Sequence, residues 1–318
     1  MSVTIDILCA TDDSFAPYCG IMLTSVFANN KNNECRVFIF VGGSLKKKTI
    51  SRFIKLEQEY GQKISFITVD MSLFDKRLLI HEDDHVSIAT FYRLLAGELL
   101  PKSVSRVLYL DGDIIVTGDL SRLWGIDLTD KAVAAVNNAV LSQTDPKRLC
   151  YPIEAGYFNA GVLLLNLDYW REKEVGRKCI DFLKSHHDIL MFQDQDVLNA
   201  VLWNEKRFIP MTYNFLVYLL KDVYFNKIPL DIQKEILDTS KNPCIIHYAS
   251  AVKPWSVVYY NLPYFKEWKF YKKLSLWSNL LPTIPKKKAV NWLIKRYILW
   301  PLGFLLPDNQ YFDLKELK

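Results

Sequence analysis

The sequence reads Val107-Leu108-Tyr109-Leu110-Asp111-Gly112-Asp113-Ile114-Ile115-Val116 at the point that decides the fold, with two apolar runs around a pair of acids. The run before Asp111 is typical of a strand that is buried on both faces. The acids therefore follow the carboxyl end of a strand, which is where ligands bind in open α/β sheets. Because Asp111 and Asp113 are two residues apart, both carboxylates point to one side of an extended chain and can share a divalent cation.

Two other interpretations of this triplet stay open on these residues alone. Asp-Gly is a common turn signal, so the triplet could form a solvated turn between the strands of a hairpin. Phosphatases of the haloacid-dehalogenase type also carry Asp-x-Asp after an apolar strand, with a nucleophilic first Asp. Their triplet usually lies near the N-terminus and is followed two residues on by Thr or Val, whereas Ile115 occupies that place here and three predicted strands precede it.

Short β-branched runs alternate with helical patterns on both sides of the triplet. The patterns predict strands over residues 3–10, 36–41, 64–69, 106–110, 132–136, 161–167 and 244–249, and helices over residues 46–60, 90–100 and 171–185. This alternation predicts an α/β fold with a mostly parallel central sheet and helices on both faces. Ligands of such a fold bind at the carboxyl ends of the strands.

The composition changes near Leu262, where Pro263, Pro282 and Pro285 interrupt an aromatic and basic stretch that ends the chain. A length of 318 residues allows one large domain and an appendage. We therefore expect a catalytic domain over residues 1–262 and a C-terminal amphipathic region over residues 263–318.

Positive charge is concentrated in this C-terminal region. The net charge of the chain is +5, yet residues 264–318 hold eleven Lys or Arg against four Asp or Glu. A near-neutral body with a basic, Trp-rich end predicts an anionic membrane surface as the partner rather than nucleic acid. Residues 290–299 suit a helix at a membrane interface. The alternative is a tail that packs on the body or mediates a dimer. Truncation after about residue 270 is expected to keep the activity of the body and to abolish liposome binding.

The six cysteines show no CxxC spacing and lie mostly in apolar runs, as reduced core thiols do. The chain enters its first predicted strand directly, without the pattern of a signal peptide. It also has no uninterrupted apolar span of about 18 residues. These features predict a cytoplasmic protein, peripheral on the inner face of the cytoplasmic membrane.

Three further polar clusters follow predicted strands or open a predicted helix. Asp12 follows the first strand and could meet a base or a ribose, or cap the helix that begins near Pro17. Gln193-Asp194-Gln195-Asp196 opens an apolar helix, and one of its acids could be a simple cap. His247 ends a strand and could complete an Asp, Asp, His site for Mn²⁺, although a lone His more often has a structural role. Lys253, on a turn stiffened by Pro254, could meet a β-phosphate.

Taken together, these clusters resemble motifs of the family 8 glycosyltransferases, notably the bacterial lipopolysaccharide α-galactosyl- and glucosyltransferases and, more distantly, glycogenin. The resemblance covers about residues 3–256. It rests on Ala10-Thr11-Asp12-Asp13, Tyr109-Leu110-Asp111-Gly112-Asp113, Tyr157-Phe158-Asn159-Ala160-Gly161-Val162, Gln193-Asp194-Gln195-Asp196, and His247-Tyr248 with Lys253-Pro254-Trp255. Turns and helix caps do not explain all five motifs in this order.

The resemblance implies a Rossmann-like domain of the GT-A type. It also implies retaining transfer of glucose or galactose from UDP-glucose or UDP-galactose to a lipopolysaccharide or lipooligosaccharide core, another glycolipid or an oligosaccharide. Asp111, Asp113 and His247 would bind Mn²⁺, with Mg²⁺ as the alternative metal. Asp194 and Gln195 would be the catalytic residues. The implied donor-binding residues are Ala10, Asp12, Ser14, Arg93, Asp111, Gly112, Asp113, Asn138, Asn159, Ala160, Ser250 and Lys253.

The sequence departs from the family pattern at two of these positions. Asn138 stands where an Asp usually holds sugar hydroxyls, and Ser250 stands where a Gly often lies near the diphosphate. An Asn side chain can still bond hydroxyls, so the first change bears on the identity of the sugar more than on the chemistry. A nucleotide-sugar binder without catalytic activity is a further alternative, which the presence of Asp111, Asp113, Gln195 and His247 disfavours.

Overall fold

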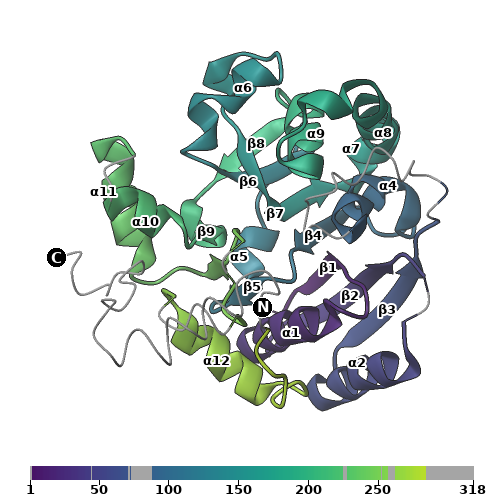
Figure 1. Ribbon diagram of the computed structural model, residues 1–318. Helices are drawn as coiled ribbons and strands as arrows, with labels where there is room; N and C mark the ends of the chain where they lie inside the picture. The colour runs from purple at the N-terminus through teal and green to yellow at the C-terminus, as the bar shows by residue number, and fades with distance from the viewer. Residues whose placement is uncertain are drawn as a thin grey trace.

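The structure is a computed structural model that describes residues 2–43, 45–70, 72, 88–224, 228–251, 253–256 and 262–283. Its centre is a seven-stranded sheet with the order β3-β2-β1-β4-β7-β6-β8 (Figure 1). The strands are β1 (Thr4–Ala10), β2 (Glu34–Val41), β3 (Lys63–Thr68), β4 (Arg106–Leu110), β6 (Val133–Asn137), β7 (Phe158–Asn166) and β8 (Lys206–Ile209). Only β7 runs antiparallel to its neighbours in this sheet, β4 and β6. The prediction of a mostly parallel sheet is confirmed.

Helices cover both faces of this sheet (Figure 1). Alternate side chains of β1 explain why, since Ile5 and Ile7 pack into the core beneath α1 (Ala16–Asn29), whereas Leu8 joins the core on the opposite face. The first core also holds α2 (Lys47–Tyr60). The second lies beneath η2 (Ile88–Leu95), α4 (Ala96–Leu99), α7 (Leu167–Glu172), α8 (Val175–His186) and α9 (Gln193–Val201).

A second, smaller sheet has the order β5-β10-β9, with β5 (Ile114–Val116), β9 (Phe215–Leu216) and β10 (Ile245–His247). β10 pairs antiparallel with β5, which places His247 opposite Ile114. The pattern predicted a strand near β10 but not this sheet, because two- and three-residue strands are too short to show a period. The pairing brings the end of β10 beside the turn that joins β4 to β5.

Short helices connect these layers. They are α5 (Ser121–Trp124), η3 (Leu141–Gln143), α6 (Asp145–Arg148), η4 (Ile153–Ala155), η5 (His187–Ile189), η6 (Met211–Tyr213), α10 (Leu219–Tyr224) and α11 (Leu230–Ser240). Figure 1 shows α6 above the ends of β6 and β8, and α10 with α11 beside the small sheet.

Two of the predicted helices differ from the structure. The helix expected over residues 90–100 is a 3₁₀ helix, η2, for most of its length, and only Ala96–Leu99 is α-helical. The helix expected over residues 171–185 is split into α7 and α8 at Glu174, whose φ of 50° lies in the left-handed region. An apolar period does not distinguish these cases, because 3₁₀ and α turns bury similar positions over one or two turns.

The first part of the C-terminal region packs against the body. α12 (Phe265–Leu274) contributes Trp268 and Tyr271 to the core beneath α1, and Trp277 follows them there. Trp277 lies so close to Gly20 of α1 that a Cβ at residue 20 would come within 2.1 Å of its ring. These two tryptophans therefore belong to the core of the body, as the alternative interpretation of the tail expected. The division at residue 262 stays a prediction, and the interfacial helix expected over residues 290–299 lies outside the described residues.

Replacing Gly20 by Ala should destabilise the protein, because the new methyl group must displace the Trp277 ring. Overpacking of this kind costs about 1 to 3 kcal/mol, which urea unfolding would measure as a lower midpoint. Gly43→Ala is the matched control, since nothing lies within 4 Å of a Cβ built there. An unchanged midpoint for Gly20→Ala would show that α12 and Trp277 do not pack on α1 as described.

None of the helices in the described part of the chain has the length and apolar composition needed to span a bilayer.

Candidate active site

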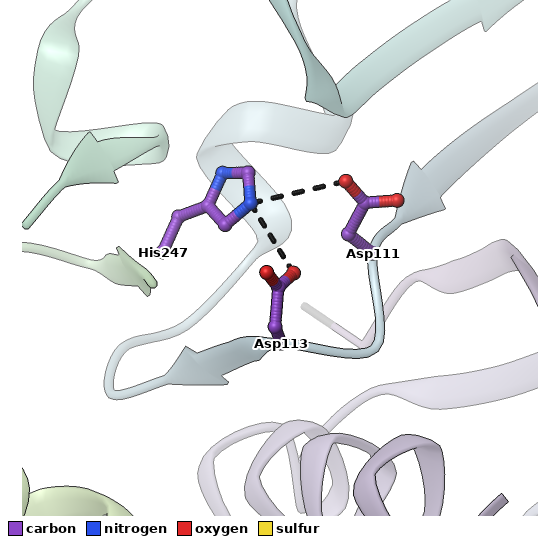
Figure 2. Close-up of side chains that lie close together, drawn as sticks. All are labelled: Asp111, Asp113 and His247. Atoms are coloured by element: carbon purple, nitrogen blue, oxygen red, sulfur yellow. Dashed lines mark ion pairs between the residues drawn. The ribbon is translucent and has the colours of Figure 1, made fainter. Parts of the chain in front are cut away.

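The ends of three strands bring Asp111, Asp113 and His247 together (Figure 2). Asp111 follows β4, Asp113 precedes β5, and His247 ends β10, which pairs with β5. His247 Nε2 lies 3.2 Å from Asp113 Oδ1 and 3.8 Å from Asp111 Oδ2. One ligand atom from each residue lies within 4.8 Å of the others, and Asp113 and His247 are buried. Two carboxylate oxygens and an imidazole nitrogen at this spacing fit a divalent cation such as Mn²⁺.

The triplet itself is a turn rather than an extended segment. The turn interpretation was right in this respect, but the hairpin was wrong, because β4 and β5 lie in different sheets. The turn is held at both ends, since the Asp111 amide donates to the Gly161 carbonyl at 2.9 Å and the Tyr248 amide donates to the Asp113 carbonyl at 3.1 Å. The two carboxylates converge because these bonds fix the turn between the sheets.

Lys253 contacts the second acid of the triplet. Its Nζ pairs with Asp113 Oδ2 and donates to the Tyr248 carbonyl at 2.9 Å. Burial disfavours a charge on Asp113, but Lys253 and His247 outweigh burial and hold the pKa of its carboxyl well below the usual range. The carboxyl of Asp113 is therefore held in its ionised form.

Arg93 connects the first acid of the triplet with the catalytic residues implied at α9. Its buried guanidinium donates to Asp111 Oδ1 at 2.8 Å and forms an ion pair with Asp194 Oδ2 at 2.9 Å. It also donates to the Ala160 carbonyl and lies over the Tyr109 ring, 4.1 Å from its centroid. Burial opposes the charge of Arg93, yet Asp111 and Asp194 raise the pKa of its guanidinium above the usual value. The Arg93 guanidinium thus pairs with the carboxylates of both Asp111 and Asp194.

The Asp194 carboxyl is unlike that of Asp113. Burial raises its pKa to about 7, although Arg93 acts in the opposite direction. The first turn of α9 has no side-chain cap, so neither acid of the motif is a helix cap. The Asp196 Oδ2 accepts the backbone amides of Met191 and Phe192, just before the helix, at 2.7 and 2.9 Å.

Gln195 occupies the first turn of α9, close to Asn159 on β7. Its Oε1 accepts from Asn159 Nδ2 at 2.9 Å and from the Ala160 amide at 3.0 Å. These residues and the three predicted metal ligands line one cleft of about 440 Å³. The structure therefore brings together Arg93, Asp111, Asp113, Asn138, Asn159, Ala160, Asp194, Gln195 and His247 around that cleft.

The remaining predicted residues are not part of the lining of the cleft. Ala10 ends β1, and the Asp12 carboxylate accepts the amides of Ser14 and Phe15 at 2.8 Å each in the turn before α1. The helix itself has no side-chain cap, so the alternative of a simple helix cap is wrong. The charge of Asp12 contributes, after burial, to the raised pKa of Tyr92, which precedes Arg93. Gly112 lies in the turn of the triplet, and the Ser250 amide donates to the Tyr248 carbonyl at 2.8 Å. Their predicted contacts with a donor stay predictions.

Asn138 lines the cleft and is almost fully buried. Its Nδ2 donates to the Tyr218 hydroxyl at 2.9 Å. Tyr218 was not predicted, because it lies in a short loop with no period or motif.

Asn214 and the hydroxyl of Tyr157 were also not predicted as parts of the site. Asn214 accepts from His247 and donates to Asn159, and the Tyr157 hydroxyl accepts from Gln195. The signal that could have found Tyr157 is its place at the start of the Tyr157–Val162 motif.

Gly161 is required by close packing at the metal site. A Cβ at this position would lie 2.1 Å from His247 Cε1 and 2.8 Å from Asp111 Oδ2. Any side chain there would push His247 away from the two acids, so the glycine in the β7 motif is explained by sterics alone.

A family model described as glycosyl transferase family 8 matches residues 6–258. The chain belongs to glycosyl transferase family 8. The match takes in every residue of the cleft, so the resemblance inferred from five motifs is confirmed. The family match also disfavours a phosphatase, because the Asp-x-Asp triplet is accounted for by membership of a glycosyltransferase family. We therefore describe the protein as a glycosyltransferase.

Individual family 8 relatives agree with this assignment. The chain is 28% identical to general stress protein A of Bacillus subtilis over 281 residues, which are 86% of this chain and 95% of the relative. It is 27% identical to a lipopolysaccharide 1,2-glucosyltransferase of Escherichia coli, over 83% of this chain and 77% of the relative. The crystal structure of the galactosyltransferase LgtC in complex with donor and acceptor sugar analogs superposes with a TM-score of 0.73 at 25% identity, covering 89% of this chain and 99% of LgtC. The fold of this family 8 protein is thus the GT-A-like fold of LgtC.

Proposed function

We propose that this glycosyltransferase transfers glucose or galactose from a UDP-sugar to a lipopolysaccharide core or another glycolipid, with retention at the anomeric carbon and with Mn²⁺. The observation that carries the proposal is the cleft, whose lining includes Asp111, Asp113 and His247 together with Asp194 and Gln195. A charged diphosphate and a neutral sugar need these two environments side by side. Relatives that act as a 1,2-glucosyltransferase and as a galactosyltransferase support a hexose donor without choosing between the two sugars.

The metal ligands and Lys253 would manage the charge of the leaving group. When bound, Mn²⁺ would supply positive charge that stabilises UDP as it departs. Lys253, which contacts Asp113 here, would add a second cation beside the diphosphate. Asp113 needs no deprotonation before it binds the ion, since its carboxyl is already ionised.

The sugar side of the cleft favours attack by the acceptor from the face that UDP leaves. Gln195 Oε1 accepts two N–H groups, so both of its lone pairs are engaged, and an amide oxygen is a poor nucleophile in any case. In this step the acceptor oxygen bonds to the anomeric carbon, the bond from that carbon to the β-phosphate oxygen breaks, and that phosphate oxygen takes the acceptor's proton. Gln195 would steady the oxocarbenium-like centre. Mass spectrometry decides the point: a glycosyl adduct trapped on Gln195 or Asp194 of the unmodified enzyme would rule out this step.

A donor-hydrolysis screen tests the function. UDP-glucose, UDP-galactose and their N-acetyl forms are each incubated with the full chain and Mn²⁺, and the release of UDP is measured. Release from one hexose donor, lost without the metal, is expected. Calorimetric binding of a UDP-sugar without any turnover would indicate a binder, and phosphate release from small esters would indicate a phosphatase. Either result would contradict the proposal.

The acceptor side of the proposal includes attachment to an anionic membrane through the C-terminal region. Lys266, Lys269, Phe270 and Lys273 are exposed along one side of α12, and Phe270 is 60% exposed. Cations beside an exposed ring suit an anionic lipid surface, and attachment would raise the local concentration of a lipid-linked acceptor.

Truncation of the chain tests this attachment. The truncation must follow residue 283 and not residue 270, because Tyr271 and Trp277 belong to the core. We expect the shortened chain to keep donor hydrolysis and to sediment less with anionic liposomes than the full chain. Equal sedimentation of the two would contradict attachment through residues 284–318. Neutral liposomes are the control.

A further inference from the structure

The imidazole of His247 has a second partner on the side away from the two acids. His247 Nδ1 lies 2.9 Å from Oδ1 of Asn214, and both residues are buried. Asn214 Nδ2 in turn donates to Asn159 Oδ1 at 2.8 Å. One buried amide therefore joins a predicted metal ligand on β10 to a predicted sugar contact on β7.

Some groups in this series of side chains can only donate, or can only accept, a hydrogen bond. These groups fix the direction of every bond in the series. Backbone amides can only donate, and the amide of Gly161 donates to Asn159 Oδ1 at 3.0 Å. Asn159 therefore presents its oxygen to Asn214, and Asn214 must donate from its NH₂ group. Asn214 is left with its oxygen toward His247, so Nδ1 of the imidazole carries a proton and donates it.

The far end of the series is fixed in the same way. Asn159 Nδ2 donates to Gln195 Oε1, and Gln195 Nε2 donates to the Tyr157 hydroxyl at 3.1 Å. That hydroxyl donates to Asp196 Oδ1 at 2.7 Å. Asp196 is completely buried and is paired with Arg148, so it accepts only. Every bond from Asp196 back to His247 therefore has one allowed direction.

We propose that Asn214 is a positioning residue that holds His247 in the tautomer with its proton on Nδ1, which leaves the Nε2 lone pair facing Asp111 and Asp113. The same residue ties the metal ligand to Asn159 and Gln195, so the metal site and the sugar site share one hydrogen-bonded frame. Groups that bind the second nitrogen of a metal-ligating His typically change metal affinity 10- to 100-fold when they are removed. The inference rests on the proposed function, because it takes His247 as a ligand of the metal.

Two substitutions at residue 214 separate its two bonds. Asn214→Leu keeps the size of the side chain and removes both bonds. Asn214→Asp keeps an oxygen acceptor for His247 but loses the N–H that Asn159 needs. Mn²⁺ affinity is measured directly by titration in the presence of UDP, alongside kcat and KM for donor hydrolysis.

We expect Asn214→Leu to weaken Mn²⁺ binding about 10- to 100-fold. Asn214→Asp should keep Mn²⁺ affinity within about threefold and yet lose kcat, because Asn159 and Gln195 are no longer held. Asn30→Leu is the matched control, since Asn30 is an equally buried amide that bonds Val26 and Leu120 in another part of the core. Its Mn²⁺ affinity should match that of the unsubstituted chain.

The inference is overturned if folded Asn214→Leu binds Mn²⁺ as tightly as the unsubstituted chain, or if Asn214→Asp weakens binding as much as Asn214→Leu does. Should either variant fail to fold, NMR of the unsubstituted chain labelled with nitrogen-15 histidine, with Mg²⁺ and UDP, gives the answer. We expect the proton of His247 on Nδ1, and a proton on Nε2 would overturn the inference. A chain with no affinity for Mn²⁺ in the presence of UDP would instead overturn the proposed function, and this inference with it.

Discussion

Replacing Asp113 by Asn should lower glycosyl transfer by about 1,000-fold while leaving the protein folded. The substitution turns an ionised side chain, the proposed metal ligand, into a neutral one. Its new NH₂ group would also face a cation, because Lys253 contacts the same side chain. The loss should appear in kcat/KM for both donor hydrolysis and transfer, and higher Mn²⁺ concentrations should recover part of it.

Asp168→Asn is the matched control for this substitution. Asp168 is an aspartate on α7 with 68% of its side chain exposed, and its one described ion pair is the long contact with Arg171 at 3.5 Å. The activity of the Asp168→Asn variant should equal that of the unsubstituted enzyme. Circular dichroism would confirm that both variants are folded. If Asp113→Asn kept more than about a tenth of the activity, Asp113 would not be a ligand on which the reaction depends.

Replacing Arg93 by Leu should lower the free energy of unfolding by about 3 to 5 kcal/mol. The guanidinium is the cation that Asp111 and Asp194 share, and its removal leaves their carboxylates without it in a buried site. Urea unfolding measures the change. Arg177→Leu is the control, because Arg177 is 71% exposed and its ion pairs lie on the surface of α8.

The loss of stability in Arg93→Leu should depend on pH through Asp194. The pKa of Asp194 is about 7 in the folded protein, above its value in an unfolded chain. A raised pKa means that the folded state is favoured at low pH, where the carboxyl is protonated, and that this contribution is lost as the pH rises through about 7. Arg93 lowers this pKa, so its removal raises the pKa further and extends the loss of stability to higher pH. The variant should therefore lose more stability at pH 8 than at pH 6.

A second substitution identifies Asp194 as the source of this effect. In Arg93→Leu with Asp194→Asn, the buried charge of residue 194 is gone, so part of the stability should return and the difference between pH 6 and pH 8 should shrink. Activity should not return, because the link from Arg93 to Asp111 is still missing. Equal instability of the single and double variants at both pH values would contradict this account.

The sequence predicted six of the seven strands of the main sheet because these six are long enough to show a pattern, whereas the four-residue β8 was not predicted. The runs that became β1, β2, β3 and β4 are each five to eight residues, with turn signals between them. The acids of the triplet could be found for the same reason, since the apolar run of β4 ends directly before Asp111. Their meeting with His247 was suggested by its place at the end of a predicted strand, and the resemblance to a family strengthened that suggestion.

Other parts of the site depend on contacts between distant residues, which no local pattern shows. β9 has two residues, so neither it nor the pairing of β10 with β5 had a signal to find. Asn214 follows a 3₁₀ turn and resembles any polar loop residue until the fold places it beside His247. Trp277 lies in a basic, Trp-rich stretch whose composition predicted a membrane-facing tail. In the structure it packs against Gly20, and this contact depends on the arrangement of α1 and α12.

The turn from Asp111 to Asp113 crosses from one sheet to the other, and His247 returns from the smaller sheet to meet both acids (Figure 2). An ion bound by all three residues would connect the two sheets, each of which has its own set of hydrogen bonds. Ligand binding stabilises the state that it selects, so part of the binding free energy would appear as resistance to local opening of β9 and β10. Binding of a ligand in the cleft would then stiffen the small sheet, which contributes few of the residues that line the cleft.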